Sequence, residues 1–406
     1  MTQGSRSGRT ARPRWAASLL TLASVAVGCA APGPAPAEPS AAPPAAAAAP
    51  AAATRFEYHA IKLGSDYNLV LFAPDQTAAD AAAAAAEAEI DRLDGVFSDY
   101  KPDSELSKLS RLTSGGPMAA PVPISDDLYA VLAAAQRVAA MTDGAFDVTV
   151  GPYVQLWRRS RRQQQLPSAD RLAEARASVG HALLRLDEPV GGGTGGTAGA
   201  GGTPVKPATT RPAGHTARLL APRMRLDVGG IATGYMSDQV LAVLRKRGIS
   251  RALCDLSGDL AVGDPPPGRA GWVVSVQALT SPGVSAGLAE VANCGFSTSG
   301  DTYRFVEVDG VRYSHIVDTR TGLGLTHRIG ATTIARDGMA ADALATVVCA
   351  LGPDRGMAFV DRAEREELFG GSGVRITTVG PDGTTAVTES ARYRAVEKPA
   401  GTQPAK

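Results

Sequence analysis

The sequence predicts an α+β fold in which mixed or antiparallel sheets pack against helices. Two kinds of segment support this class. Some runs alternate apolar and polar residues, as strands with one buried face do, and others place apolar residues every three or four positions, as amphipathic helices do. Both kinds are interspersed throughout residues 55–386, and no linker separates them into two parts. We therefore expect one compact domain, either as a single body or as two lobes.

The N-terminus has the pattern of an export signal. Four arginines within the first 14 residues precede a short apolar run over residues 15–27, which is too short for an ordinary membrane span. Three small residues then precede Cys29, as in a bacterial lipobox. We expect residues 1–29 to be a lipoprotein signal peptide, with Cys29 lipidated and the protein exported and anchored to the extracytoplasmic side of a bacterial cell membrane. The alternative is an ordinary secretory signal that is cleaved nearby.

Three further segments are expected to lie outside the packed domain. Residues 30–54 are almost entirely alanine and proline and cannot bury a core, so they predict an extended tether. Residues 191–214 form a glycine-, threonine- and proline-rich insert, which predicts a disordered surface loop. The polar residues 387–406 predict a flexible tail. The net charge of +1 gives no reason to expect nucleic acid as a partner.

The first half of the domain predicts strands followed by helices. Residues 56–74 predict two strands around a turn, residues 80–93 an alanine-rich helix, and Ser104 and Ser125 are suited to cap the next two helices. A tight turn then leads into an extended stretch that Gly151 and Pro152 should end. The basic residues 158–162 predict a solvated helix face rather than a binding patch. Beyond them we expect a helix at 168–180 and a strand at 182–186.

A glycine-rich stretch near the middle of the chain offers an anion site. A strand-like run at 224–228 leads into Gly229, Gly230 and Gly234, and a helical pattern begins at Ile231. Such a turn presents free backbone N–H groups and the positive end of a helix dipole, which suits a pyrophosphate. The alternative is that the glycines only allow a strand and a helix to pack closely. Neither a Walker loop nor a dinucleotide fingerprint is present.

The second half predicts mostly strands. Single strands are expected at 251–256, 272–277, 288–293 and 329–335, and a hairpin at 303–317 across Asp309 and Gly310. A polar turn is expected at 295–301 and a helix at 339–351.

Asp342 and Thr346 lie one turn apart on that last helix and therefore share a face. A carboxylate and a hydroxyl are hard oxygen donors that suit Mg²⁺. The alternative is an aspartate that interacts with the helix dipole and a threonine that bonds back to a carbonyl.

His315 lies three residues before Asp318 at a strand end and is a candidate acid or base, because Asp318 could orient its imidazole. The alternative is a histidine with a purely structural role.

Seven motifs follow one another between about residues 56 and 365. They are Phe97-Ser-x-Tyr100 with Ser104-Glu-Leu-Ser107, Gly144-Ala-Phe-Asp-Val-Thr-Val-Gly-Pro152 with Trp157, Leu226-Asp-Val-Gly-Gly-Ile-Ala-x-Gly-Tyr235, Ser257-Gly-Asp259, Ser297-Thr-Ser-Gly300, His315-Ile-Val-Asp-x-x-Thr-Gly322 and Ala341-Asp-Ala-Leu-Ala-Thr346. In this order they resemble the FAD:protein FMN transferase family, the ApbE-type or thiamine biosynthesis lipoprotein-like proteins.

The resemblance implies an exported α+β transferase. Such an enzyme binds FAD with Mg²⁺, moves FMN onto a Thr or Ser hydroxyl of a target flavoprotein and releases AMP. The acceptor carries a signature of the type Asp-x-x-Ser/Thr-Gly-Ala-Thr. The resemblance assigns Asp342, Thr346 and the carbonyl of Gly230 to the metal and His315, supported by Asp318, to acid–base catalysis. The implied FAD contacts are Leu63, Tyr100, Ala145, Phe146, Asp147, Asp227, Gly229, Thr233, Asp259 and Ile316.

The chain departs from the family pattern at several positions. Thr233 stands where lysine is frequent, which removes a possible phosphate partner, and Thr319 stands where proline is usual. The segment Gly330-Ala-Thr332 follows Ile329 rather than Ser or Thr, so the chain carries no flavinylation target of its own. Three alternatives to the transferase remain, of which a lipoprotein solute-binding module is the most distant, because it would explain the tether but not Asp342 and Thr346 with His315. The other two are a pyrophosphatase that cleaves FAD to FMN and AMP, and a non-catalytic FAD-binding lipoprotein.

Overall fold

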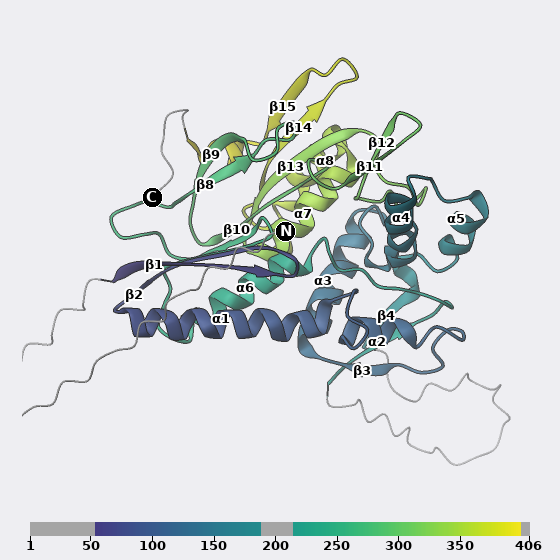
Figure 1. The fold of residues 1–406 in the computed structure, drawn as a ribbon, viewed down its shortest axis with the longest axis horizontal. Helices are drawn as coiled ribbons and strands as arrows, with labels where there is room; N and C mark the ends of the chain where they lie inside the picture. Colours follow the sequence, from purple (N-terminus) through teal and green to yellow (C-terminus); the bar gives the residue numbers. More distant parts are fainter. Residues whose placement is uncertain (1–52, 188–213, 399–406) are drawn as a thin grey trace, which may run out of the picture. The chain divides into compact units, whose positions relative to one another are not determined.

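The structure is a computed structural model that describes residues 53–187 and 214–398 (Figure 1). The predicted signal peptide with Cys29, the tether up to residue 52, the insert up to residue 213 and residues 399–406 lie outside the described residues. No helix in the described part of the chain is both long enough and apolar enough to cross a bilayer.

An eight-stranded antiparallel sheet forms the centre of the domain, which confirms the predicted α+β class. In spatial order its strands are β1 (Thr54–Lys62), β2 (Ser65–Ala73), β6 (Ala252–Leu256), β7 (Asp259–Val262), β10 (Cys294–Gly300), β13 (Arg328–Ala335), β14 (Gly373–Val379) and β15 (Thr385–Glu389).

Three long helices build the main core against this sheet: α1 (Gln76–Phe97), α6 (Ala232–Arg245) and α7 (Gly338–Leu351). Helix α7 packs on β10 and β13, α6 packs on β6 and β7, and α1 runs along α6 (Figure 1). Helix α7 is buried almost all round, as its apolar composition requires. Helix α6 lies beside α7, and their facing residues carry several of the predicted site groups.

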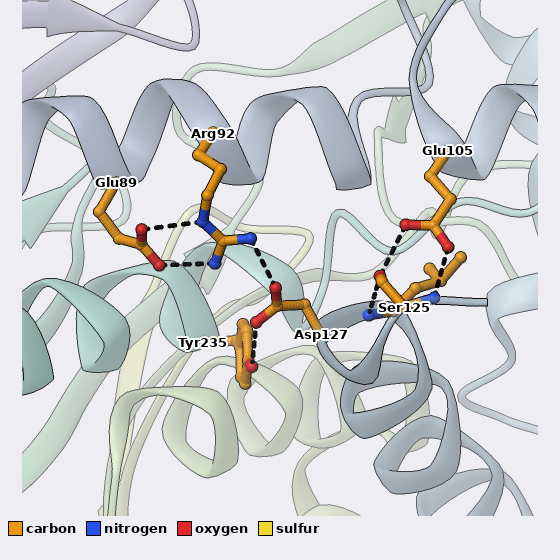
Figure 2. Close-up of polar contacts among 7 residues, drawn as sticks. Glu89, Arg92, Glu105, Ser125, Asp127 and Tyr235 are labelled. Carbon is orange, nitrogen blue, oxygen red and sulfur yellow. Dashed lines mark hydrogen bonds and ion pairs between the residues drawn. The ribbon is translucent and has the colours of Figure 1, made fainter. Parts of the chain in front are cut away.

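A chain of polar contacts fixes the N-terminal half of α6 (Figure 2). Tyr235 of α6 donates to Asp127 over 2.8 Å, and Arg92 of α1 bonds the second oxygen of the same carboxylate over 2.7 Å. Asp127 begins α3 (Asp126–Met141), which Ser125 caps, and Glu105 of α2 (Glu105–Arg111) accepts from the Ser125 backbone and hydroxyl groups. Four helices are thereby locked together around the start of α6.

The remaining elements flank this centre. They are β3 (Val122–Ile124), α4 (Gly151–Gln163), α5 (Ala169–Arg176), β4 (Leu184–Leu186), β5 (His215–Leu219), β8 (Trp272–Gln277), β9 (Ser285–Val291), β11 (Phe305–Val308), β12 (Val311–Ser314), α8 (Pro353–Ala363), α9 (Ala391–Arg394), β16 (Glu397–Lys398) and three short 3₁₀ turns, Val148–Val150, His181–Leu183 and Glu367–Phe369.

The predicted elements are largely present, but four assignments are wrong. Residues 224–228 belong to no strand, residues 295–301 lie in the central strand β10 rather than in a turn, and Gly151 and Pro152 begin α4 rather than end a strand. The tail predicted from residue 387 is folded as far as it is described, because β15, α9 and β16 follow and Tyr393 is completely buried.

Candidate active site

Two hydrogen bonds bring three of the predicted motifs together. The N–H of Asp227 donates to the carbonyl of Val148 over 2.8 Å, which joins the glycine-rich turn to the segment before α4. The hydroxyl of Thr319 donates to the carbonyl of Gly144 over 2.8 Å, which joins the segment after β12 to the same region. Motifs that are far apart in sequence therefore meet at one place.

Helices α6 and α7 cross with their backbones in contact. A Cβ atom on Gly234 would lie 2.0 Å from the carbonyl oxygen of Gly338, and one on Gly338 would lie 2.6 Å from the carbonyl oxygen of Gly234. Asp238, one turn further along α6, accepts from the N–H groups of Gly338 and Met339 at 2.8 and 2.9 Å and thereby helps to cap α7. The glycines are needed here for close approach rather than for an unusual backbone conformation.

This crossing brings together the three predicted metal ligands. The carboxylate of Asp342 accepts from the backbone N–H of Gly234 over 3.1 Å and also from that of Thr233. A Cβ on Gly230 would lie 2.9 Å from the hydroxyl oxygen of Thr346, so the backbone of Gly230 faces that hydroxyl directly. The hydroxyl of Ser299 on β10 lies 3.4 Å from the Thr346 hydroxyl on the other side.

The chemistry of this cluster fits a hard divalent cation. Burial, with the nearby Asp259 carboxylate as the second cause, raises the pKa of Asp342 well above its usual value. Burial likewise raises the pKa of Asp259 to about 7, against the hydrogen bond from Ser297, which lowers it. No group of three or more His, Cys, Asp or Glu side chains in the described residues could hold a metal. A site here would therefore combine one carboxylate with hydroxyl and carbonyl oxygens, the donors that Mg²⁺ accepts alongside water and phosphate oxygens.

An arginine that was expected to be solvated lies in the cofactor side of the site. Arg158 of α4 is half-buried, bonds Asp99 over 2.6 Å and lies 3.7 Å from the Asp227 carboxylate. Its guanidinium also lies 4.0 Å from the ring centroid of Tyr100, which is 77% exposed. An exposed aromatic ring beside a cation suits a planar ring system such as that of a flavin or adenine. The expectation that residues 158–162 only form a solvated face is wrong for Arg158.

The turn at Asp227 keeps its glycine accessible. The Asp227 carboxylate accepts from the N–H of Gly229 over 2.9 Å, and Gly229 is exposed. Burial, with the nearby Asp99 as the second cause, raises the pKa of Asp227, while the Gly229 N–H and Arg158 lower it. Thr233, in the first turn of α6, is half-buried.

Other predicted FAD contacts are used partly by the fold itself. Phe146 is buried in the main core, and the buried carboxylate of Asp147 accepts from the N–H and hydroxyl of Thr149. Ala145 and Ile316 are half-buried, and Ile316 packs against the main core. Leu63 is exposed in the turn between β1 and β2 at φ 54°, and no contact recorded for the described residues joins it to the rest of the cluster.

His315 is held in one tautomer. Its Nδ1 lies 3.2 Å from the carbonyl oxygen of Arg304, and because a carbonyl can only accept, Nδ1 carries the proton and Nε2 has the free lone pair. Burial is the main cause that lowers the pKa of His315 to about 4, with the charge of Arg304 second. The ring of Trp157 packs edge-on against the imidazole at 6.3 Å between centroids.

Asp318 does not support His315, contrary to the prediction. Its carboxylate bonds the Arg320 side chain at 3.1 and 3.0 Å and the Arg320 N–H at 2.9 Å. Burial raises the pKa of Asp318, but these bonds outweigh it and the pKa is lowered. The carbonyl of Arg304 takes the role that was expected of the carboxylate.

Sequence reasoning did not single out Arg158, Ser299 or Arg304 as members of the site. Ser299 lies within a quoted motif, so its position could have suggested a role. The two arginines are recognisable only when their neighbours in space are known.

The chain matches the model of the ApbE family over residues 63–369. A FAD:protein FMN transferase of Haemophilus influenzae is 31% identical over 282 residues, which cover 68% of this chain and 74% of the relative. The transferase of the same name from Vibrio cholerae is 30% identical over 283 residues, which cover 68% and 76%. The apo structure of the Pseudomonas stutzeri flavinyl transferase ApbE superposes with a TM-score of 0.67 at 26% identity, covering 85% of this chain and 97% of that one.

The fold, the order of the motifs along the chain and the match over most of its length agree with one another. The chain therefore belongs to the ApbE family.

Proposed function

We propose that this protein transfers FMN from FAD onto a Thr or Ser hydroxyl of an acceptor flavoprotein and releases AMP, with Mg²⁺ as the required metal. The observation that carries the proposal is the meeting of Gly230, Asp342 and Thr346 at the crossing of α6 and α7, directly after the turn that holds Asp227. The relatives named FAD:protein FMN transferase support the same reaction.

In this mechanism the carbonyl of Gly230, the carboxylate of Asp342 and the hydroxyl of Thr346 would hold the metal. Bound Mg²⁺ would neutralise charge on the pyrophosphate of FAD as the transfer proceeds. The exposed Gly229 lets the pyrophosphate approach the start of α6, where backbone N–H groups and the helix dipole favour an anion. Tyr100 and Arg158 bind the planar part of the nucleotide, and Asp227 is a further FAD contact.

His315 is the base of the reaction. The acceptor hydroxyl attacks the phosphorus of the FMN half, a new O–P bond forms, and the P–O bond to the AMP phosphate breaks, so that AMP leaves with the bonding electron pair. The hydroxyl proton passes to Nε2 of His315, which is neutral and faces the reaction with its lone pair. The negative charge of bound FAD raises the pKa of the imidazole toward neutrality, which makes it a better base than in the free enzyme.

The acceptor and the location complete the proposal. The acceptor carries an Asp-x-x-Ser/Thr-Gly-Ala-Thr signature, and Cys29 anchors the transferase by a lipid to the extracytoplasmic side of the membrane. The chain's own Gly330-Ala-Thr332 cannot serve as a target, because it lies in the buried strand β13 and lacks the Ser or Thr. This segment is therefore not the acceptor in the proposed reaction.

Covalent labelling tests the proposal. The full-length protein is incubated with FAD, Mg²⁺ and a flavoprotein domain that carries the signature, and covalent flavin is followed by in-gel fluorescence. We expect labelling that is abolished by a chelator and that falls on the order of 10²- to 10³-fold in Asp342→Ala, since a metal supplies several kcal/mol of transition-state stabilisation. The matched control is Asp361→Ala, on the exposed face of α8, which should label like the parent.

The same reaction mixture separates the alternatives. Release of FMN and AMP without labelling would show a pyrophosphatase, in which water takes the place of the acceptor hydroxyl. Tight FAD binding with neither product would show a non-catalytic FAD-binding protein and overturn the proposal.

A further inference from the structure

The charges of the site leave the pyrophosphate without a recognised cationic side chain. Asp259 and Asp342 lie close enough for their charges to interact, Asp227 precedes the glycine-rich turn, and the pyrophosphate of FAD adds two negative charges. Arg158 already pairs with Asp99 and approaches Asp227. Thr233, in the first turn of α6, is neutral and bonds Asp342 through its backbone N–H only. A single divalent cation would therefore have to neutralise the charges of both the aspartates and the pyrophosphate.

Arg304 is a cation next to His315 whose side chain has no bonded partner among the residues that the structure describes. It lies between β10 and β11, it is exposed, and its guanidinium makes no ion pair or hydrogen bond with any residue that the structure describes. By contrast, the neighbouring Arg312 and Arg328 both bond the buried Asp301, which fixes them in the fold.

The backbone of Arg304 is fixed beside the proposed base. Its carbonyl oxygen accepts from the N–H of His315 over 3.0 Å and lies 3.2 Å from Nδ1 of the same residue. The side chain therefore starts next to the imidazole. Burial is the larger influence on the pKa of both Asp259 and His315, and the positive charge of Arg304 lowers both.

We propose that Arg304 clamps the pyrophosphate of FAD between the metal cluster and His315. This inference rests on the proposed function and assigns the cation that neutralises the phosphates. A guanidinium remains charged at all relevant pH values and binds two phosphate oxygens at once, which also orients the phosphorus toward His315. Arg161 also influences His315, but its guanidinium lies 5.9 Å from the ring of Trp157 and is the weaker influence of the two.

Equilibrium binding to the full-length protein in Mg²⁺ tests the clamp. The probes are ADP, which carries the pyrophosphate without a flavin, and riboflavin, which carries the flavin ring without a phosphate. In Arg304→Gln we expect Kd for ADP and for FAD to rise about 10- to 100-fold, the usual size of a charged hydrogen bond, while Kd for riboflavin stays the same. Arg304→Lys should recover part of the loss, because it restores the charge but not the two-point contact.

The control is Arg365→Gln, an exposed arginine that follows α8, which should bind all three probes like the parent. Unchanged ADP affinity in Arg304→Gln would overturn the clamp, and so would an equal loss of riboflavin binding, because that would indicate general damage to the pocket. These outcomes leave the proposed function intact if labelling of the acceptor persists. A parent protein that fails to bind FAD would instead refute the proposed function.

Discussion

The site has two walls that are built in opposite ways. The inner wall consists of Gly230, Gly234, Asp342 and Thr346, where backbones touch and the carboxylate of Asp342 is almost inaccessible. The outer wall consists of Tyr100, Arg158, Arg304 and His315, which are exposed or half-buried and lie on loops and on α4. The inner wall therefore depends on the packing of the whole domain, whereas most of the outer wall can change without loss of the fold.

Substitution at the crossing of α6 and α7 should have the largest effect. In Gly234→Ala the new methyl group meets a backbone oxygen at 2.0 Å, and no rotamer can relieve this contact. We expect a loss of about 3 kcal/mol in the free energy of unfolding, measured with urea, together with loss of Mg²⁺-dependent labelling.

Gly95→Ala provides the control for that experiment. Gly95 lies in α1 with nothing within 4 Å of its added Cβ, so the same change should stabilise the protein by about 0.5–1 kcal/mol. Equal stability of Gly234→Ala and the parent would mean that the two helices can separate and that the inner wall is not rigid.

Replacement of the base in the outer wall should affect catalysis rather than folding. In His315→Gln we expect labelling of the acceptor to fall about 10²- to 10⁴-fold, because general base catalysis is lost, while FAD affinity stays within a few-fold of the parent. A comparable loss of FAD binding would contradict this division and would assign His315 to substrate binding.

The lowered pKa of His315 gives a second, independent measurement on the same variant. The folded pKa is about 4 and the ordinary value is 6.5, so the unfolded chain takes up a proton first as the pH falls. Stability from this group is complete above about pH 6.5 and is lost as the pH falls toward 4. The parent should therefore lose more stability than His315→Gln between about pH 7.5 and pH 5, as measured by urea unfolding. Equal losses would show that the imidazole is not buried in its neutral form.

The smallest effect is expected at Asp318. Its carboxylate bonds the exposed Arg320 and not His315, so Asp318→Asn should change labelling by no more than about twofold and stability by less than about 1 kcal/mol. A tenfold fall in labelling would restore the pairing with His315 that the sequence predicts.

Much of the fold could be predicted because local patterns agree with the final structure. The capping serines at 104 and 125, the hairpin across Asp309 and Gly310 and the helix that carries Asp342 all formed where their sequences indicate. The error at residues 295–301 has a physical cause. Small polar residues usually mark a turn, but here their hydroxyls bond Asp259 and face Thr346 from within a central strand, so tertiary contacts decide the conformation.

The site could be predicted only where spacing fixes geometry. Asp342 and Thr346 share a helix face in any α-helix, and the motif order identified the family. The partners of Arg158 and the carbonyl that orients His315 come from other segments, and no local pattern encodes them. The opposite error occurs at Asp318. Its closeness to His315 in sequence suggested a contact between the two side chains, but its carboxylate bonds Arg320 instead.

The pairing of β4 with β5 has a consequence for the evolution and engineering of the chain. Leu186 pairs with Ala217, and the N–H of Asp187 donates to the carbonyl of Thr216 over 2.9 Å, so the two ends of the segment 188–213 are held side by side. Replacing the 26 residues 188–213 with a turn of about four residues is expected to lower the free-energy cost of closing this loop by about 1.6 kcal/mol. The same point could instead carry an inserted reporter domain or the new termini of a circular permutant.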